Sequence, residues 1–407
     1  MSQSCDTPKQ KLMSVDDAIE RLLSQAVTLT DTETVLLQDA LGRVLAEPVH
    51  SDVNVPPHDN SAMDGYAVRA ADVAAAGKSL PVSQRIAAGQ TGSPLAQGTA
   101  ARIFTGAPIP EAADTVVMQE LCEQQADNVI INTVPAPGAN VRAAGEDIKQ
   151  GATILEPGIR LRPQELGLAA SVGIAQLTVH RRLTVALFAT GDELVDPGQP
   201  LEPGQIYNSN RYTLTGLLQS QGCEIIDLGR VADTLEDTCA ALTDAASKAD
   251  FIISSGGVSV GEEDYVKLAV EQLGQLDMWR VAMKPGKPVA YGKVGDTDFI
   301  GLPGNPVSVF VTFCLFARPF INKMQGLTQV LIQPVKIIAG FDWPKPGKRR
   351  EFARAQVRAD YTLTLFPHQG SGVLSSAAWA DGLVELPENT TIKQGDTVNY
   401  YSFRELF

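Results

Sequence analysis

The sequence contains few residues of the types that usually build metal cages or covalent catalytic centres. Its 407 residues include five cysteines and four histidines, and no two cysteines form a C-x-x-C pair. Scattered single cysteines indicate neither a zinc site nor a disulfide framework, and they fit a reducing cytoplasm. No nucleophile with a paired base is recognisable, so covalent catalysis has no support.

Long apolar runs and an excess of positive charge are also missing. The most apolar segment, Val307 to Ile321, is interrupted by Arg318 and Pro319 and is too short to cross a bilayer. The polar N-terminus does not resemble a signal peptide. A formal net charge of −14 disfavours binding to nucleic acid or anionic membranes. We therefore expect a soluble cytoplasmic protein that uses locally placed cations to bind any anionic ligand.

The pattern of apolar residues divides the chain into modules. Between Arg182 and Met324, strand-like runs alternate with helical stretches, which predicts a doubly wound parallel sheet. From Glu47 to about Ile148, short β-like runs separated by Pro and Gly indicate a mainly β module. Alternating segments after about Val330 indicate a small C-terminal β domain. The capping-box spacing at 14–17 predicts a first helix.

The stretch SSGGVSVGEEDY, residues 254–265, combines bare backbone with three carboxylates. Gly256 and Gly257 allow main-chain N–H groups to approach phosphate oxygens closely. The carboxylates would repel those oxygens unless a divalent cation such as magnesium lies between them. A glycine-rich turn followed by a helix whose first turn is acidic explains the same sequence, because the helix dipole favours acidic residues there. The loop is not of the Walker type, because no Gly-Lys-Ser/Thr follows.

Comparable loops follow other strands of the predicted sheet. They are Thr190–Glu193, Asp233, Lys284–Pro288 and Pro303–Pro306. Ligands of open α/β sheets bind at the carboxyl ends of the strands, so we expect these loops to surround one crevice. Glu193 and Asp233 could instead serve helix starts, and PGNP could be a rigid turn. The two lysines of KPGKP favour an oxyanion clamp, because the prolines fix their backbone.

Seven motifs then connect the chain to a known family. They occur in the order PPHDNSAMDGYAV, IFTGAPIP, GEDI, ATGDEL, SSGGVSVGEEDY, MKPGKP and GLPGNPVS. From about Ser14 to the C-terminus the chain thereby resembles the MoeA family of molybdopterin molybdenumtransferases, which includes the gephyrin E domain. The resemblance implies an enzyme that takes adenylylated molybdopterin and molybdate. It would cleave the adenylate with magnesium and release molybdenum cofactor and AMP.

The resemblance also implies an elongated homodimer with active sites shared between subunits. A molybdopterin adenylyltransferase would donate the substrate, and molybdoenzymes or cofactor carriers would receive the product. We expect a discontinuous linker domain at 1–26, 46–52 and 144–176, and a mainly β domain at 53–143. A doubly wound domain resembling molybdopterin adenylyltransferase would comprise 27–45 and 177–327. Residues 328–407 would form a β-barrel-like domain.

Candidate site residues follow from this combination of chemistry and resemblance. For magnesium at the pyrophosphate we expect Glu193, Asp233 and Asp264, and for donors to the phosphates Gly256, Gly257 and Ser259. For substrate and molybdate binding we expect Lys284, Lys287, Pro303, Pro306, Ser308, Arg354 and Ser371. Arg349 and Arg350 are alternatives to Arg354. The resemblance alone implies catalytic roles for Asp59, Thr105 and Asp147, and Arg280 stands where some relatives have a lysine.

Two other functions share parts of this pattern. A molybdopterin adenylyltransferase has the SGG-type domain but needs neither the Asp59 loop nor the C-terminal module. A non-catalytic scaffold that binds peptides, as the gephyrin E domain does, would not need intact acidic loops. The Asp59 loop, the C-terminal module and the acidic loops are all present here, so the sequence favours the molybdenumtransferase.

Overall fold

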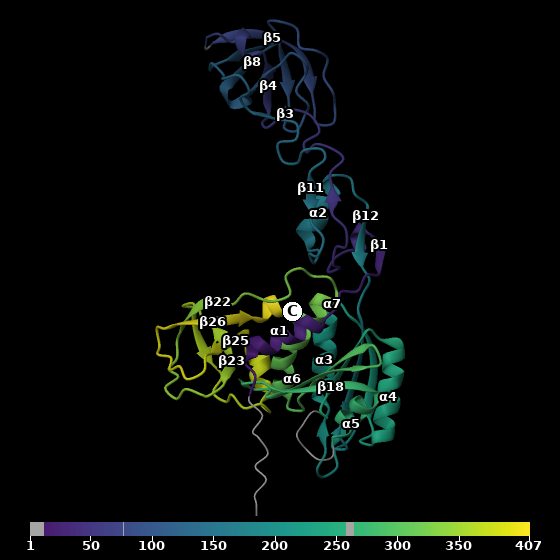
Figure 1. Ribbon diagram of the computed structural model, residues 1–407. Coiled ribbons are helices and arrows are strands. Elements are labelled where there is room, and N and C mark those ends of the chain that lie inside the picture. The colour runs from purple at the N-terminus through teal and green to yellow at the C-terminus, as the bar shows by residue number, and fades with distance from the viewer. Residues whose placement is uncertain (1–11, 76, 258–263) are drawn as a thin grey trace, which may run out of the picture.

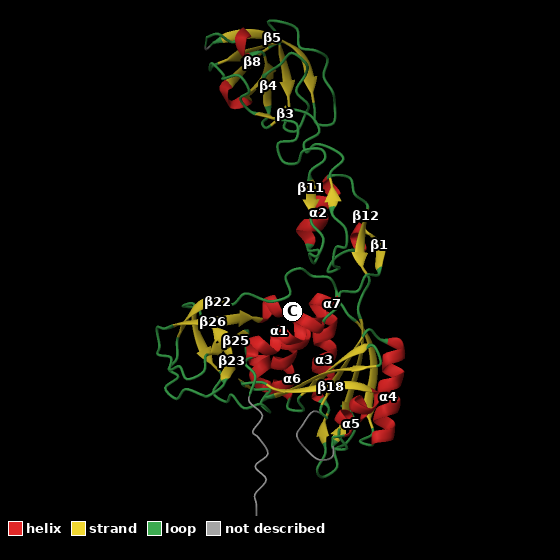
Figure 2. Cartoon of the chain, in the orientation of Figure 1, coloured by secondary structure: helices red, strands yellow, loops and turns green. Residues whose placement is uncertain are grey.

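The computed structural model describes residues 12–75, 77–257 and 264–407. The chain is elongated, with a mainly β module at one end and a slender linker behind it (Figure 1). An α/β domain and a C-terminal β domain lie side by side at the other end. Strands dominate the distal module and the C-terminal domain, whereas the long helices are concentrated around the α/β sheet (Figure 2).

The α/β domain is built on a six-stranded sheet of order β16-β13-β17-β21-β20-β18. Neighbouring strands from β16 to β21 run parallel, and β20 is antiparallel to both β21 and β18. The predicted doubly wound sheet is confirmed, with an antiparallel strand near one edge. The strands are β13 Thr184–Thr190, β16 Glu224–Val231, β17 Phe251–Ser255, β18 Gly274–Arg280, β20 Pro288–Val294 and β21 Thr297–Leu302.

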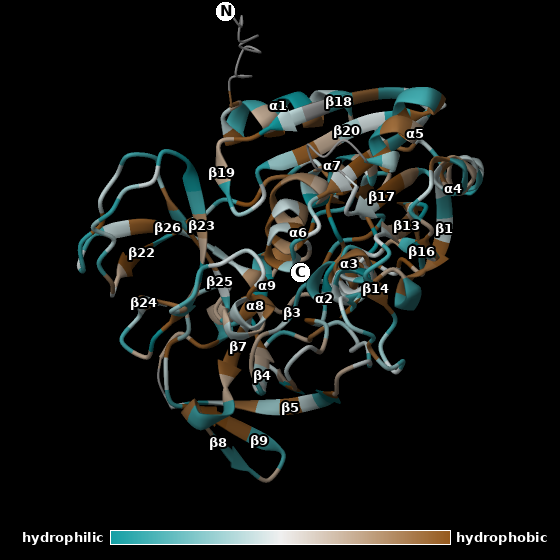
Figure 3. Cartoon of the chain, turned by 90° about the horizontal axis from the view of Figure 1, so that it is seen from below, coloured by the Kyte–Doolittle hydropathy of each residue, from teal (hydrophilic) through white to brown (hydrophobic). Residues whose placement is uncertain are grey.

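Helices cover both faces of this sheet. Val185 and Leu187 of β13 belong to one buried cluster, and Ala186 and Phe188 belong to another, because successive strand side chains point to opposite faces. The apolar strands β13 and β17 lie inside the domain (Figure 3). One face packs against α1 Val15–Gln25, α3 Ser209–Ser220, α6 Pro306–Thr312 and α7 Arg318–Met324; the other packs against α4 Leu235–Lys248 and α5 Tyr265–Leu273.

The N-terminal segment differs from the expected domain boundaries. Helix α1 begins after Ser14, whose Oγ accepts the N–H of Asp17 at 3.0 Å, as the capping spacing predicts. Its side chains Ala18 and Leu22 are fully buried in the α/β core, not in the linker. The following β1, Thr32–Leu36, pairs with β12, Gln176–His180, in the linker. The sequence of an amphipathic helix indicates that its apolar face packs against another element, but it does not indicate which element.

The linker and the mainly β module contain the remaining N-terminal elements. The linker has β2 Val49–His50 paired with β11 Thr153–Leu155, the helix α2 Pro163–Ser171 and the 3₁₀ turn η1 Leu37–Asp39. The module has a six-stranded sheet of order β7-β4-β6-β5-β9-β8. Its elements are β3 Asn60–Ser61, β4 Gly65–Val68, η2 Ala70–Asp72, β5 Lys78–Ile86, β6 Ala100–Ile103, β7 Thr115–Met118, η3 Gln119–Leu121, β8 Cys122–Gln125, β9 Asn128–Ile131 and β10 Val141–Arg142.

The C-terminal domain is a closed barrel, as the sequence predicts. Five strands pair in the order β23-β24-β22-β26-β25, and β25 pairs back with β23. Closure leaves the five strands without a free edge. The short strand β19, Met283–Lys284, joins the barrel to the α/β domain by pairing with β23. The elements are β22 Val335–Ala339, β23 Arg350–Val357, β24 Thr362–Leu365, α8 Leu374–Trp379, β25 Gly382–Leu386, β26 Thr397–Ser402 and α9 Phe403–Leu406.

One helical run is long and apolar enough to cross a membrane by length and composition. It joins α6, the π turn η4 (Phe313–Ala317) and α7 into 19 residues, and 83% of its most apolar window is buried inside the protein. The expectation that this segment is too short to cross a bilayer is wrong on length and composition alone, because the helical run continues through Arg318 and Pro319. The π turn ends at Ala317, two residues before Pro319, whose ring and missing N–H do not fit a regular helix interior. The run is the core helix of the α/β domain.

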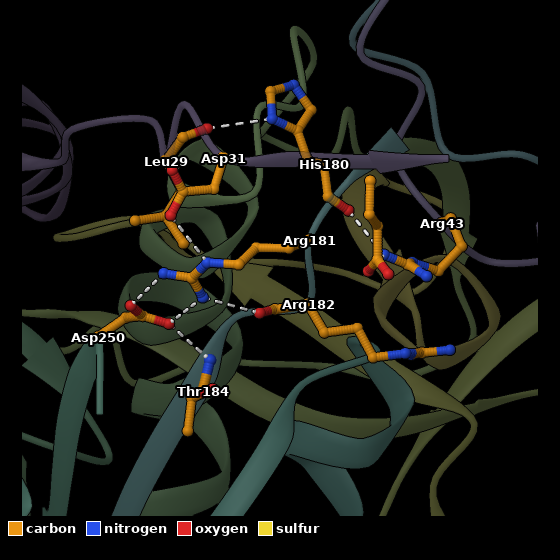
Figure 4. Close-up of polar contacts among 9 residues, drawn as sticks. Leu29, Asp31, Arg43, His180, Arg181, Arg182, Thr184 and Asp250 are labelled. Carbon is orange, nitrogen blue, oxygen red and sulfur yellow. Dashed lines mark hydrogen bonds and ion pairs between the residues drawn. The ribbon is translucent and has the colours of Figure 1, made fainter. Parts of the chain in front are cut away.

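Arg181 joins the linker to the α/β domain (Figure 4). Its guanidinium donates to both carboxylate oxygens of Asp250, at 2.6 and 2.7 Å, and to Asp31 at 3.1 Å. The backbone N–H of Thr184 donates to the same Asp250 carboxylate at 2.8 Å. The Arg181 guanidinium and the Asp250 carboxylate form two charge-assisted hydrogen bonds, and such a pair fixes the relative orientation of the two groups as well as their distance. This contact therefore orients the linker on the sheet.

Candidate functional site

Two cavities adjoin each other at one edge of the α/β sheet. Their volumes are about 600 Å³ and about 700 Å³. The loops after β13, β17 and β21 lead into them, so they occupy the place where open α/β sheets bind ligands. Both cavities are lined by Glu193, Ile206, Gly256, Gly257, Gly304 and Pro306. These six residues therefore form a shared wall.

The first cavity is the acidic cavity, because Glu193, Asp233 and Asp264 line it together. Asp264 is 7% exposed and is the N-cap residue of α5, where its Oδ1 accepts the N–H of Lys267 at 3.2 Å. The carboxylate of Glu193 lies over Gly191, within 2.6 Å of where a Cβ there would stand. The structure thus brings together the three carboxylates that the sequence singled out.

The glycines of the loop after β17 are required by its backbone. Gly256 and Gly257 have φ values of +92° and +66°, in the region that side chains with a Cβ rarely adopt. A Cβ on Gly257 would lie 2.3 Å from Cγ2 of Val266. The bare backbone therefore lines both cavities, where N–H groups can meet ligand oxygens. Ser259 lies outside the described residues.

The acidic cavity is not a closed metal cage. Among residues 12–75, 77–257 and 264–407, no group of three or more His, Cys, Asp or Glu side chains is arranged to hold a metal ion. Magnesium typically takes one or two carboxylates and completes its octahedral shell with water and phosphate oxygens. Three carboxylates spread around one cavity fit an ion that protein and ligand hold jointly.

The second cavity is the basic cavity, because Lys284, Lys287 and Arg349 line it. Ser308 and Ser371 add hydroxyl groups, and Pro303 and Pro306 belong to the same lining. The pairing of β19 with β23 places the barrel residue Arg349 beside the lysine loop, and its Nη1 donates to the carbonyl of Met283 at 3.2 Å. Three cations and two hydroxyls are a donor set suited to an oxyanion.

Arg354, a predicted donor to molybdate, does not line either cavity. It is 1% exposed, and its guanidinium donates to Ser376 Oγ, Phe352 O and Gly370 O. Burial lowers the pKa of Arg354 to about 10. Because these bonds stay inside the barrel, Arg354 supports the loop that carries Ser371. Arg349, one of the two alternatives, does line the basic cavity.

The residues assigned by resemblance lie elsewhere in the chain. Asp59, Thr105 and Asp147 line neither cavity, and the module that carries β3 lies at the far end of the molecule (Figure 1). Asp59 accepts the N–H of Ala144 at 2.8 Å. Thr105 donates through both N and Oγ1 to Asp64 at 2.8 Å, and these bonds lower the pKa of Asp64. Within one chain, these three residues and the cavity residues are therefore not brought together.

Sequence reasoning missed the segment Tyr207–Asn210, which lines the acidic cavity. Its signal was available, because Asn208 directly precedes a helix and asparagine is a preferred N-cap residue. Asn208 is indeed the N-cap of α3. Gln369, two residues before the predicted Ser371, also lines the basic cavity. Arg280, at the end of β18, lines neither cavity.

Three segments match known family regions in the order of the domains. Residues 13–173 match the MoeA N-terminal region (domain I and II), 186–323 a probable molybdopterin binding domain, and 336–403 the MoeA C-terminal region (domain IV). The fold and the site thus define a multidomain protein in which a molybdopterin-binding type of α/β domain adjoins a C-terminal barrel.

Full-length relatives specify the family. The chain is 41% identical to the molybdopterin molybdenumtransferase of Haemophilus influenzae, over 97% of this chain and 100% of that one. It is 35% identical to that of Bacillus subtilis, over 98% and 95%. The crystal structure of a molybdopterin biosynthesis moeA protein from Pyrococcus horikoshii superposes with a TM-score of 0.85 at 31% identity, over 96% and 99%. The chain belongs to the molybdopterin molybdenumtransferase family, whose members are transferases of molybdenum cofactor biosynthesis.

Proposed function

We propose that the chain inserts molybdate into adenylylated molybdopterin, cleaves the adenylate in a magnesium-dependent step, and releases molybdenum cofactor and AMP. The observation that carries this proposal is the wall shared by the acidic and basic cavities. A ligand that follows this wall has its phosphates near three carboxylates and its other end near three cations. This distribution of negative and positive charge fits a nucleotide-linked substrate that reacts with an oxyanion.

In the acidic cavity, Glu193, Asp233 and Asp264 hold or orient magnesium at the pyrophosphate. When bound, the ion would supply positive charge that offsets the repulsion between carboxylates and phosphates. Gly256 and Gly257 donate backbone N–H groups to the phosphates, with Ser259 assigned the same role. Burial of Asp264 supports a fixed rather than a mobile carboxylate at this position.

In the basic cavity, Lys284, Lys287 and Arg349 bind molybdate, and Ser308 and Ser371 donate hydroxyl hydrogen bonds. Molybdate is a doubly charged oxyanion, and charge-assisted bonds are roughly twice as strong as neutral ones. Pro303 and Pro306 hold the rim between the two cavities. The net charge of −14 on the whole chain makes this local concentration of cations necessary for anion capture.

Asp59, Thr105 and Asp147 act on the cavities of the opposite subunit in a two-fold homodimer. The supporting observation is the separation within one chain between the β module that carries β3 and the α/β domain (Figure 1). In this account the enzyme works in the cytoplasm, receives its substrate from a molybdopterin adenylyltransferase, and passes cofactor to molybdoenzymes or carriers.

The test is incubation of the purified full chain with adenylylated molybdopterin, molybdate and magnesium, followed by assays for AMP and for active cofactor. We expect both products in equal amounts, and neither after chelation of the metal. Substrate that remains adenylylated under these conditions would contradict the proposal. Release of AMP without active cofactor would show that the chain only hydrolyses the adenylate.

A further inference from the structure

The first turn of α3 forms a wall of the acidic cavity that has no assigned role. Asn208, Ser209 and Asn210 all line the cavity. Helix α3 has 12 residues, and the N-terminus of a helix of this length carries partial positive charge and unpaired N–H groups. This turn is separate from the Gly256–Gly257 loop, which supplies another part of the wall.

Asn210 fixes this turn to two other cavity loops. Its Nδ2 donates to Oγ of Ser255 at 2.8 Å and to the carbonyl of Gly304 at 2.7 Å. Asn210 is 9% exposed, so solvent does not compete for these bonds. The first turn of α3, the end of β17 and the loop after β21 are therefore held in one arrangement before any ligand arrives, which lowers the entropy lost on binding.

Two buried polar atoms in this turn have no hydrogen-bond partner among the described residues. Asn208 is 2% exposed. Its Oδ1 caps the helix by accepting the N–H of Arg211 at 3.2 Å, whereas its Nδ2 has no partner among the described residues. The Oδ1 of Asn210 is likewise unpartnered there. Buried polar groups are normally hydrogen-bonded, so two such orphans beside a cavity require an explanation.

We propose that the first turn of α3 is a phosphate subsite, which binds a phosphate group of the nucleotide-linked substrate through Nδ2 of Asn208 and the backbone N–H groups of Ser209 and Asn210. These groups are all donors, and they lie at the positive end of the helix, so they select an anion. The Oδ1 of Asn210 accepts an N–H or O–H of the same ligand. The proposal rests on the proposed function for the identity of the substrate.

The decisive substitutions at Asn208 remove its Nδ2 donor and keep an oxygen that caps α3. Asn208→Asp retains an oxygen that caps as well as asparagine does, but it replaces the Nδ2 donor with negative charge. Asn208→Ser retains a capping oxygen and removes the donor without adding charge. Ser14→Asp makes a comparable change at the N-cap of α1, which lines neither cavity, and serves as the matched control.

Binding is measured by calorimetric titration of the full chain with ADP, and separately with inorganic pyrophosphate, both with magnesium and without molybdate. We expect Asn208→Asp to weaken both ligands by about tenfold or more, and Asn208→Ser by a smaller factor. Ser14→Asp should bind like the wild type. All four proteins should melt within about two degrees of one another, because each keeps its N-cap.

Three results would overturn the subsite. They are wild-type affinity in Asn208→Asp, weakening for ADP but not for pyrophosphate, and no binding of either ligand to the wild-type chain. Parallel assay of AMP release separates this proposal from the proposed function. If the wild type releases AMP but Asn208→Asp binds normally, only the subsite is wrong. If the substitutions weaken binding but the wild type makes no AMP, only the function is wrong.

Discussion

The ammonium of Lys284 lies 3.1 Å from a carboxylate oxygen of Glu351, so the basic cavity contains an internal ion pair. The pairing of β19 with β23 sets the two residues directly opposite each other. Among the described residues, Lys287 has no such carboxylate partner. The two lysines of one short loop are therefore electrostatically different, although their sequence context is nearly the same.

This difference predicts unequal effects on molybdate use. Lys287→Ala should raise the molybdate concentration for half-maximal insertion by roughly one to two orders of magnitude, because one charge-assisted bond is lost. Lys284→Ala should have a smaller effect, since Glu351 already offsets that charge. Molybdate dependence of cofactor formation is the measurement, with Lys267→Ala on the exposed side of α5 as the control. Equal effects of the two lysines would contradict the assignment.

Glu351→Gln should act in the opposite direction. Removing its negative charge frees Lys284 to face the oxyanion and raises the positive potential of the cavity. We expect half-maximal insertion at a lower molybdate concentration than in the wild type. An increase in the required concentration would show instead that Glu351 positions Lys284 for binding.

Asp264→Asn should abolish magnesium-dependent AMP release with little change in melting temperature. Asparagine caps helices as well as aspartate does, so the bond to the N–H of Lys267 is retained and α5 stays formed. Glu271→Gln, on the same helix, is the control and should keep full activity. Wild-type turnover in Asp264→Asn would show that this carboxylate does not serve the metal.

Stability in acid should depend on the junction between Arg181 and Asp250. Burial alone would raise the pKa of Asp250, but hydrogen bonds from Arg181 and Thr184 and the charge of Arg181 outweigh it, so the pKa lies below its ordinary value of 3.8. A depressed pKa stabilises the fold above the unfolded-state value. That contribution is lost as the pH falls through the folded-state value.

We therefore expect Asp250→Asn to destabilise the chain by about 1.5–3 kcal/mol at pH 7. The difference from the wild type should shrink below about pH 4. Denaturant unfolding across this pH range is the measurement. Asp244→Asn, which breaks an exposed pair with Lys248, should cost about 0.5 kcal/mol or less. A difference between Asp250→Asn and the wild type that is independent of pH would contradict this account of the junction.

The sequence predicted which residues belong to the site better than it predicted which residues they contact. The carboxylates and glycines at strand ends could be found because the topology of an open sheet brings strand ends together. The pair between Lys284 and Glu351 could not, because it depends on how the barrel docks against the sheet. Arg354 and Arg349 are five residues apart, and only the barrel geometry decides which one is buried and which one reaches the cavity.

The packing of α1 could not be predicted for a related reason. The sequence of α1 contains a clear cap and an apolar stripe, so its start could be predicted. Its partner could not, since the stripe fits any apolar surface. The segment Tyr207–Asn210 was overlooked because its importance comes from the buried bonds of Asn210 to Ser255 and Gly304, which join loops distant in the chain.

The measurement that tests the central claim most directly is complementation between subunits. Asp59→Asn and Asp264→Asn should each be inactive as homodimers, since each destroys one half of every site. Co-expressed, they form heterodimers in which one site carries both changes and the other carries neither. Random pairing makes half of the dimers mixed, so AMP release at roughly a quarter of the wild-type rate is expected for a two-fold assembly. No recovery in verified heterodimers would show that the two residues do not serve one site across the interface.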